Sequence, residues 1–195
     1  MVLGSFMRLF TGLSLAPSVI EKLSAVLEQL RRTAPIQWSP IDNLHITCRF
    51  IGAWPEERAD DIRAALKTVT VAAPVPIAIS RFGFFPNPPH PHFLFAGVQA
   101  GPQLQTLVSA IDQALLPLGL AAETRPYSPH VTLARIKAED DIRALRERIA
   151  AITDFDFGSF EAREFHLYES ILSARSSVYT KQATYDLMRE NKTTS

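Results

Sequence analysis

The 195-residue sequence contains a single cysteine, Cys48, and no net charge, with 20 Lys and Arg residues balancing 20 Asp and Glu residues. A lone cysteine excludes an intramolecular disulfide framework and zinc sites built on paired cysteines, and it is typical of a reducing compartment. We therefore expect a cytoplasmic protein. Balanced charge provides no bulk attraction to nucleic acid or to an anionic membrane, so contact with RNA would require a local site.

Long apolar runs are also missing. No window approaches the ~20 apolar residues that a membrane helix needs, so we expect no membrane association. The apolar stretch 1–10 lacks the basic start of a signal peptide and is interrupted by Arg8, which favours a first buried strand. Neither a phosphate-cradling glycine loop nor a Gly-x-Ser-x-Gly elbow occurs.

Apolar residues make up 47% of the chain, which is ordinary for a globular protein with a core. Apolar residues at helical spacing predict helices near 17–32, 55–69, 102–116 and 139–150. Strands are predicted near 6–14, 44–51, 74–82, 93–98, 155–160, 164–172 and 177–185, with a polar tail after Met188. The order helix, motif strand, helix, strands occurs twice. This rhythm predicts an α+β protein of two lobes with a cleft between them, forming one domain over residues 1–195.

Two stretches share a core pattern, Asn43–Phe50 and Ser128–Arg135, and each places a His two residues before a Thr. Side chains alternate between the two faces of a strand, so each His and its Thr point the same way. The intervening apolar residues point into the core. We therefore expect each motif to present one imidazole and one hydroxyl, and the two motifs to form one site.

This set of groups suits transfer at a phosphodiester without a metal. Because histidine titrates near neutrality, one imidazole can be neutral and the other protonated at the same pH. The neutral ring takes a proton from attacking water and the charged ring donates one to the departing oxygen. Thr47 and Thr132 can donate hydrogen bonds to the non-bridging oxygens. The sequence does not assign the two roles between His45 and His130.

The paired motifs, at 45–48 and 130–133, resemble those of the 2H phosphoesterase superfamily, whose signature is two His-x-Thr/Ser-hydrophobic motifs, one per lobe. Within it, the chain is similar to the RNA 2′,3′-cyclic phosphodiesterases, also called 2′-5′ RNA ligase-like proteins. Further matches are Arg8-Leu9-Phe10, Phe50-Ile51-Gly52, Phe85-Pro86, Leu167-Tyr168-Glu169-Ser170 and Tyr179. Cys48 stands where the family usually has Leu, and we expect it to pack as a smaller hydrophobe.

The resemblance implies a bilobal α+β fold, with two pseudo-symmetric lobes whose antiparallel sheets line a central cleft and whose helices lie outside. It also implies an RNA 2′,3′-cyclic 3′-phosphodiesterase that hydrolyses a terminal cyclic phosphate to a 2′-phosphate without metal or cofactor. By the same resemblance His45 is the proton donor and His130 the proton acceptor. The expected substrates are RNA 3′ ends or small cyclic nucleotides, and the expected state is a monomer.

Other polar residues lie near the motifs. Arg135 matches a family arginine associated with phosphate, but plain alternation aims it at the opposite face, so we expect a β-bulge or the strand's end to redirect it. Arg49 shares the face of His45, where it either contacts substrate or balances charge. Arg125 and Tyr127 lie in the loop that leads into the second motif, from which they could touch the nucleotide. His90-x-His92 lacks an acidic or Cys partner, which favours an exposed loop over a metal site.

Two alternatives remain open. One is a different activity of the same superfamily, such as a 2′-5′ RNA ligase, a 2′-5′ oligoadenylate phosphodiesterase or an ADP-ribose cyclic phosphate hydrolase, because the His pair serves all of these. The other is a non-catalytic nucleotide- or RNA-end-binding module. Two titratable groups in matching contexts disfavour the second alternative, since binding alone does not require them.

Overall fold

The computed structural model describes residues 5–172 and 177–188, and the predicted tail after Met188 lies outside them. The strands are β1 (Phe6–Ser14), β2 (Gln37–Trp38), β3 (His45–Pro55), β4 (Val75–Phe85), β5 (Phe93–Ala100), β6 (His130–Arg135), β7 (Asp156–Ala162), β8 (Glu164–Leu172) and β9 (Ser177–Asp186). The helices are α1 (Pro17–Leu30), α2 (Ala59–Leu66), α3 (Pro102–Leu115) and α4 (Arg143–Ala150). Short 3-10 helices are η1 (Ile41–Asn43), η2 (Glu56–Arg58) and η3 (Leu116–Leu118).

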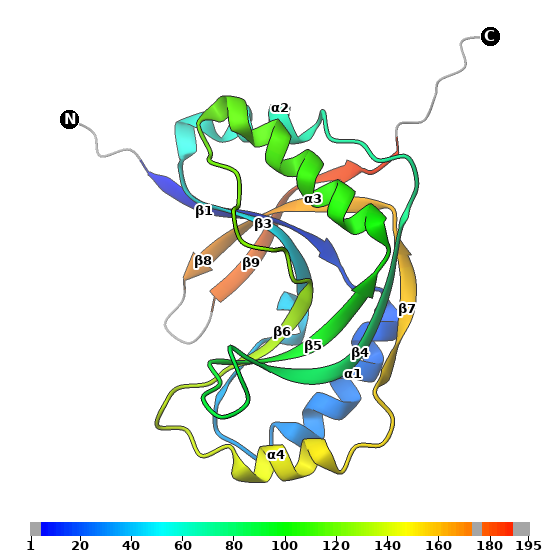
Figure 1. Cartoon of the computed structure of the whole chain (residues 1–195). Helices are drawn as coiled ribbons and strands as arrows, with labels where there is room; N and C mark the ends of the chain where they lie inside the picture. Colours follow the sequence, from blue (N-terminus) through cyan, green and yellow to red (C-terminus); the bar gives the residue numbers. More distant parts are fainter. Residues whose placement is uncertain (1–4, 173–176, 189–195) are drawn as a thin grey trace.

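The strands form one curled antiparallel sheet in the order β7-β4-β5-β6-β3-β1-β8-β9, and β2 pairs with β6 (Figure 1). In this order, which leaves out β2, four strands lie on each side of the seam between β6 and β3. The predicted α+β fold with antiparallel strands and helices outside is confirmed. The structure adds that the two halves share a continuous sheet.

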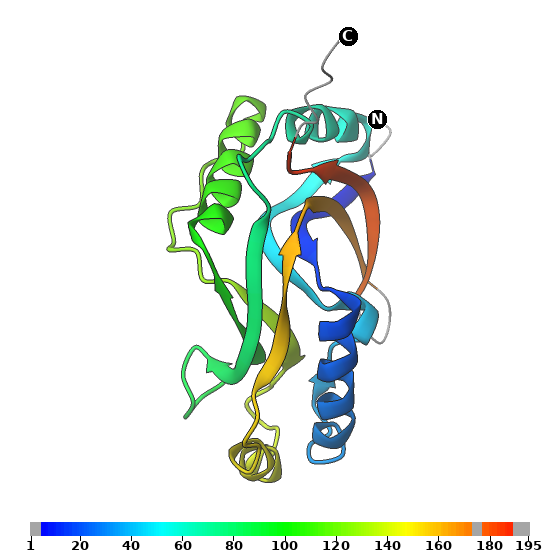
Figure 2. The same cartoon turned by 90° about the vertical axis from the view of Figure 1, so that its right-hand side faces the viewer.

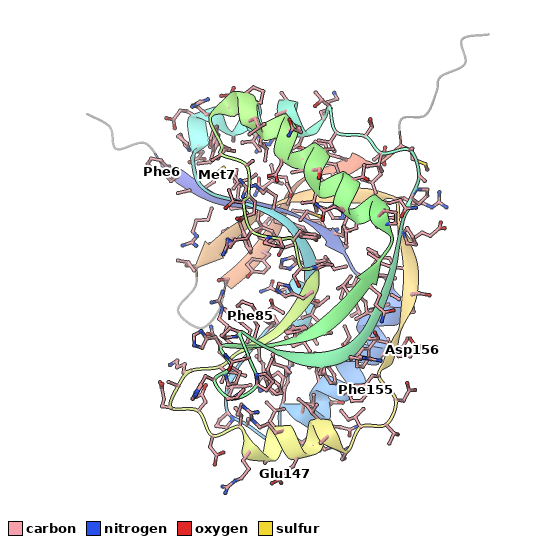
Figure 3. All side chains as sticks on the ribbon, in the orientation of Figure 1. Phe6, Met7, Phe85, Glu147, Phe155 and Asp156 are labelled. Atoms are coloured by element: carbon pink, nitrogen blue, oxygen red, sulfur yellow. The ribbon has the colours of Figure 1, made fainter. Side chains whose placement is uncertain are left out.

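The helices gather at opposite ends of the molecule. Figures 1 and 2 both place α2 and α3 at one end and α1 and α4 at the other. Leu145 of α4 is buried, whereas Glu147 is exposed and points away from the sheet (Figure 3). In the described ranges no helix has both the length and the apolar character needed to cross a membrane.

Several predicted boundaries were wrong. The second helix, α2, covers Ala59–Leu66 rather than 55–69, and β4 ends at Phe85 rather than at 82. The first motif strand was predicted to end at 51, just before Gly52, but β3 continues to Pro55. Gly52 has a φ of 88° and lies where the register between β1 and β3 shifts, so it accommodates a bulge in the strand. The fourth helix begins at Arg143 and is shorter than the predicted 139–150.

Both motif strands are backed by the hydrophobic core. Ile46 and Val131 are fully buried, and Cys48 is 4% exposed. The prediction that Cys48 packs as a small hydrophobe is confirmed. Burial raises the pKa of the Cys48 thiol to about 12, because the thiolate would lose its hydration there.

Candidate active site

The seam between β3 and β6 brings the two motifs together. Its recorded pair is Ile46 with Val131 in antiparallel register. In this register the flanking residues also face each other across the seam, so His45 lies beside Thr132 and Thr47 beside His130. Since Ile46 and Val131 point into the core, the four polar side chains point to the other side of the sheet. We call that side the site face.

Each imidazole is held by a hydrogen bond to a backbone carbonyl two residues earlier in the chain. Nδ1 of His45 donates to the carbonyl oxygen of Asn43 at 2.6 Å, and Nδ1 of His130 donates to that of Ser128 at 2.8 Å. A carbonyl can only accept a hydrogen bond, so Nδ1 carries a proton in each ring. Nε2 is therefore the atom that each ring offers for proton transfer. In His45 it lies 2.9 Å from Oγ1 of Thr47.

Aromatic rings surround His45. Its centroid lies 4.8 Å from that of Phe10, 5.2 Å from that of Tyr179 and 5.8 Å from that of Tyr168. Phe10 also stacks on Tyr168 at 5.0 Å, and the Tyr168 hydroxyl is 3.0 Å from Oγ of Ser14. Burial lowers the pKa of His45; the Asn43 carbonyl opposes this shift and the charge of His130 adds to it.

Sequence reasoning did not identify this aromatic surround. Tyr168 and Tyr179 come from β8 and β9, more than a hundred residues after His45, and reach it through strand pairing. The available signal was that both tyrosines belong to stretches that carry the family resemblance.

The surroundings of His130 are more open. Its side chain is exposed, and the aromatic ring recorded beside it is that of Phe95 on β5, with centroids 5.8 Å apart. Phe95 lies over Gly83 of β4, where a Cβ atom would overlap the phenyl ring. The two histidines therefore share their backbone contact but differ in exposure.

A bulge in β6 redirects Arg135. β5 pairs Phe95 with Thr132 and Leu94 with Ala134, so Leu133 has no partner on β5. Leu133 and Ala134 are both buried, and the next residue, Arg135, is exposed. Its Cζ atom lies 5.1 Å from the centre of the Phe93 ring. The predicted redirection is confirmed, and Arg135 lies on the same face as the histidines.

Arg49 is engaged away from the seam. Its Nε atom lies 2.6 Å from Oδ1 of Asp112 on α3, and its guanidinium also contacts Glu123 and donates to the carbonyl oxygen of Ala121. These contacts join β3 to α3 and to the loop before the second motif. The charge-balancing alternative fits them, and the predicted substrate contact of Arg49 stays untested.

Tyr127 and Arg125 lie in the same loop. The Tyr127 hydroxyl donates to the carbonyl oxygen of Thr47 at 2.8 Å, and burial raises the pKa of this phenol. Arg125 is exposed and bonds to Glu123. Tyr127 thus ties the loop before His130 to the strand of His45. Its predicted contact with the nucleotide, like that of Arg125, is not tested by these observations.

No metal ligands are assigned. His90 and His92 lie in the exposed loop between β4 and β5, which begins after Phe85 (Figure 3). Across residues 5–172 and 177–188, no three His, Cys, Asp or Glu side chains are placed to hold one metal ion.

Two hollows lie apart from the histidine pair. One, of about 460 Å³, is bordered by residues of β4, β5 and β7, including Ile77 and Phe160. The other, of about 390 Å³, is bordered by Phe6, Arg63 and Glu169. Neither is lined by a motif residue.

Comparisons with known proteins agree on one family. The family model described as the 2′-5′ RNA ligase superfamily matches residues 15–171. A relative from Methanocaldococcus jannaschii, named RNA 2′,3′-cyclic phosphodiesterase, is 32% identical over 89% of this chain and 96% of its own. One of the same name from Archaeoglobus fulgidus is 30% identical over the same shares.

Solved structures have the same fold. LigT of E. coli in complex with 3′-AMP matches with a TM-score of 0.73 and 21% identity, covering 95% of this chain and all of that one. TT0787 of Thermus thermophilus matches with a TM-score of 0.72 and 24% identity, covering 93% of this chain and 98% of that one. The family model and the curated relatives confirm the predicted family resemblance, and the chain belongs to the 2′-5′ RNA ligase superfamily.

Proposed function

We propose that the protein is an RNA 2′,3′-cyclic phosphodiesterase that hydrolyses a terminal cyclic phosphate to a 2′-phosphate by a two-histidine mechanism without a metal. The substrate is an RNA 3′ end or a small cyclic nucleotide. The protein acts as one monomeric, cytoplasmic domain and needs no cofactor. The names of the relatives support the substrate class, and the site supports the chemistry.

One observation carries the mechanism. Ile46 pairs with Val131 across the seam, which sets two His-x-Thr motifs side by side in opposite directions. A general acid and a general base on opposite sides of a phosphorus atom fit an in-line displacement, in which water enters opposite the departing oxygen. Because Nδ1 of each ring donates to a backbone carbonyl, Nε2 is the atom that can exchange a proton with substrate or water.

The proposed step balances as follows. Nε2 of His130 takes a proton from water as the water oxygen bonds to phosphorus. The bond from phosphorus to the 3′ oxygen breaks, and that oxygen receives the Nε2 proton of His45. The product has a 3′-hydroxyl and a 2′-phosphate. Burial, which lowers the pKa of His45, makes its imidazolium a stronger acid, and the charge of a bound phosphate stabilises that imidazolium.

The remaining groups stabilise charge. Thr47 and Thr132 flank the histidines and can donate to the non-bridging oxygens, where negative charge increases in the transition state. Arg135 lies on the same face with an exposed guanidinium and is proposed as a phosphate ligand. Arg49 and Tyr127 are proposed to hold the loop that leads to His130, because their recorded bonds join that loop to β3 and α3.

The test is product analysis in EDTA. Native protein is incubated with a nucleoside 2′,3′-cyclic phosphate, and then with an oligonucleotide bearing the same end, and 2′- and 3′-phosphate products are separated. We expect a 2′-phosphate product. His45→Ala and His130→Ala should each lower the rate by roughly 10²–10⁴-fold, whereas His90→Ala, in the exposed loop, should retain full activity.

Other outcomes point elsewhere. A 3′-phosphate product, a need for added metal, or full activity in either motif variant would contradict the proposal. Joining of a 5′-hydroxyl RNA faster than hydrolysis would favour the ligase alternative. Saturable binding of the cyclic end without turnover would favour the binding module.

A further inference from the structure

We propose that Asn43 is a positioning residue whose side-chain amide fixes the β8–β9 hairpin to the first motif and holds Tyr179 against the imidazole of His45. The inference deepens the proposed function and rests on it for the catalytic meaning of His45. The contacts themselves are independent of that function.

Asn43 forms hydrogen bonds through its side-chain amide and through its backbone carbonyl. Its Nδ2 donates to the carbonyl oxygen of Ser177 at 2.6 Å, and its Oδ1 accepts from the backbone N–H of Tyr179 at 3.3 Å. Its own carbonyl oxygen accepts the Nδ1 proton of His45 at 2.6 Å. The side chain therefore bonds to β9 while the backbone of the same residue orients the imidazole.

Within the described residues, the sheet itself provides no hydrogen-bonded link between these segments. Two strands, β1 and β8, lie between β3 and β9 in the strand order, so no ladder bond joins the first motif to β9. Three apolar side chains near the described end of the hairpin contribute little burial, because Ile171, Val178 and Leu172 are 49%, 50% and 67% exposed. An amide that satisfies two backbone groups of β9 is thus a strong local restraint.

The restraint sets the surroundings of His45. Tyr179 meets His45 edge-on with centroids 5.2 Å apart, and it meets Phe10 edge-on at 5.0 Å. Tyr179 therefore closes one side of the aromatic surround. If the amide is removed, the end of the hairpin can separate from η1, and water can reach the imidazole.

Two effects on His45 have opposite signs. Among the residues that the structure describes, the titratable groups that face it are His130 from β6, Tyr168 from β8 and Tyr179 from β9, while β1 presents Phe10 and Ser14, which do not titrate. Burial is the largest cause that lowers the pKa of His45, and the hydrogen bond to the Asn43 carbonyl raises it. Release of the hairpin should therefore raise the pKa, whereas displacement of the carbonyl alone should lower it.

The experiment is an NMR titration of the His45 ring proton in the free protein, with the resonance assigned by its loss in His45→Gln. We expect Asn43→Ala to raise the pKa of His45 by roughly 0.5 unit or more. The matched control is Asp42→Ala, an exposed side chain of the same 3-10 helix, which should not raise it. The corresponding limb of the kcat/KM profile should move in the same direction as the titration.

A double variant tests the route through Tyr179. In a Tyr179→Leu background, Asn43→Ala should add little further shift, because both changes open the same side of the ring. An unchanged or lowered pKa in Asn43→Ala, or fully additive shifts, would overturn the inference. If the alanine variant does not fold, Asn43→Gln, which displaces the amide by one methylene, carries the same expectation and the same refutation. No substrate is present in the titration, so its failure is separate from a failure of the proposed hydrolysis.

Discussion

At the scale of single residues, the two histidines form the same kind of backbone hydrogen bond but have different surroundings. Each donates Nδ1–H to a carbonyl two residues earlier in the chain. His45 is half-buried among three aromatic rings, and His130 is exposed beside one. This asymmetry gives a physical basis for assigning different roles to two motifs that look alike in the sequence.

The pH dependence of the reaction should report His45. The profile of kcat/KM reflects ionisations of the free enzyme. We expect one apparent pKa below 6.5, the ordinary value of histidine, because burial and the charge of His130 lower the pKa of His45. Phe95→Leu, which alters the ring beside His130, should leave this ionisation in place. The absence of any ionisation below 6.5 would contradict the assignment.

Gly12 sets the distance between His45 and β1. A Cβ atom there would lie 2.8 Å from the carbonyl oxygen of Ile46 and 3.3 Å from Cδ2 of His45. We expect Gly12→Ala to displace the imidazole and to lower kcat by about 10- to 100-fold. Gly119→Ala is the control: its φ of 87° makes a side chain unfavourable, but no atom lies within 4 Å. It should cost about 1–2 kcal/mol of stability and leave kcat unchanged. Equal kcat losses in both variants would rule out this role.

At the scale of elements, the bulge in β6 joins local structure to function. The unpaired Leu133 reverses the alternation, so that His130, Thr132 and Arg135 occupy one face of a six-residue strand. An unbroken strand would have turned Arg135 into the core, where an unpaired charge is costly. The bulge therefore explains how a buried strand can present three polar groups to one substrate.

Arg135→Gln tests the consequence of that bulge. A charge-assisted hydrogen bond is worth about 1.5–3 kcal/mol, so we expect kcat/KM for a cyclic nucleotide to fall by about 10- to 100-fold. Arg163→Gln is a matched control, because Arg163 is also exposed and its recorded partner is Glu161. If both substitutions have the same effect, the loss reflects net charge and Arg135 is not a phosphate ligand.

β8 also contains a buried histidine outside the motifs. His166 is 0% exposed, with Nδ1 3.0 Å from Oγ1 of Thr184 and Nε2 3.3 Å from Nζ of Lys181. Burial, and then the charge of Lys181, lower the pKa of His166 from 6.5 to about 4. The unfolded chain therefore binds a proton below pH 6.5 that the folded protein does not bind until about pH 4. This contribution to stability is complete above pH 6.5 and is lost as the pH falls towards 4.

Urea unfolding of His166→Gln should show this dependence. Between pH 7.5 and pH 4.5, the native protein should lose at most about 2.5 kcal/mol more than the variant. His90→Gln, in the exposed loop, should follow the native protein. Parallel curves for native protein and His166→Gln would show that folding does not lower the pKa of His166.

At the scale of the whole molecule, long-range pairing decides what the sequence could predict. The alternation around His45 and His130, and the position of β1, β8 and α1, follow from local patterns, and these predictions agree with the structure. The Arg135 bulge was also predictable, since alternation alone would have buried a charge. Gly52 was misread because a glycine is compatible with both a strand end and a bulge.

The rest depends on contacts between distant segments. The continuity of the sheet at Ile46 and Val131 joins residues 85 positions apart, and no local pattern specifies that pair. Arg49 shares the face of His45 by alternation, but its partners on α3 and in the following loop could not be anticipated. For the same reason, the sequence showed Asn43 only as the residue before a motif strand and did not indicate its partners on β9.

The central claim is that His45 donates the proton to the leaving 3′ oxygen and His130 removes one from water. The most direct test compares a 2′,3′-cyclic phosphate with an analogue that has sulfur at the 3′ bridging position, since a thiolate leaves without a proton. On the oxygen substrate both His45→Ala and His130→Ala should lose roughly 10²–10⁴-fold. On the sulfur substrate His45→Ala should regain most of that loss, while His130→Ala should stay impaired. Rescue of His130→Ala alone would reverse the two roles, and equal impairment of both variants on both substrates would contradict general acid–base catalysis by this pair.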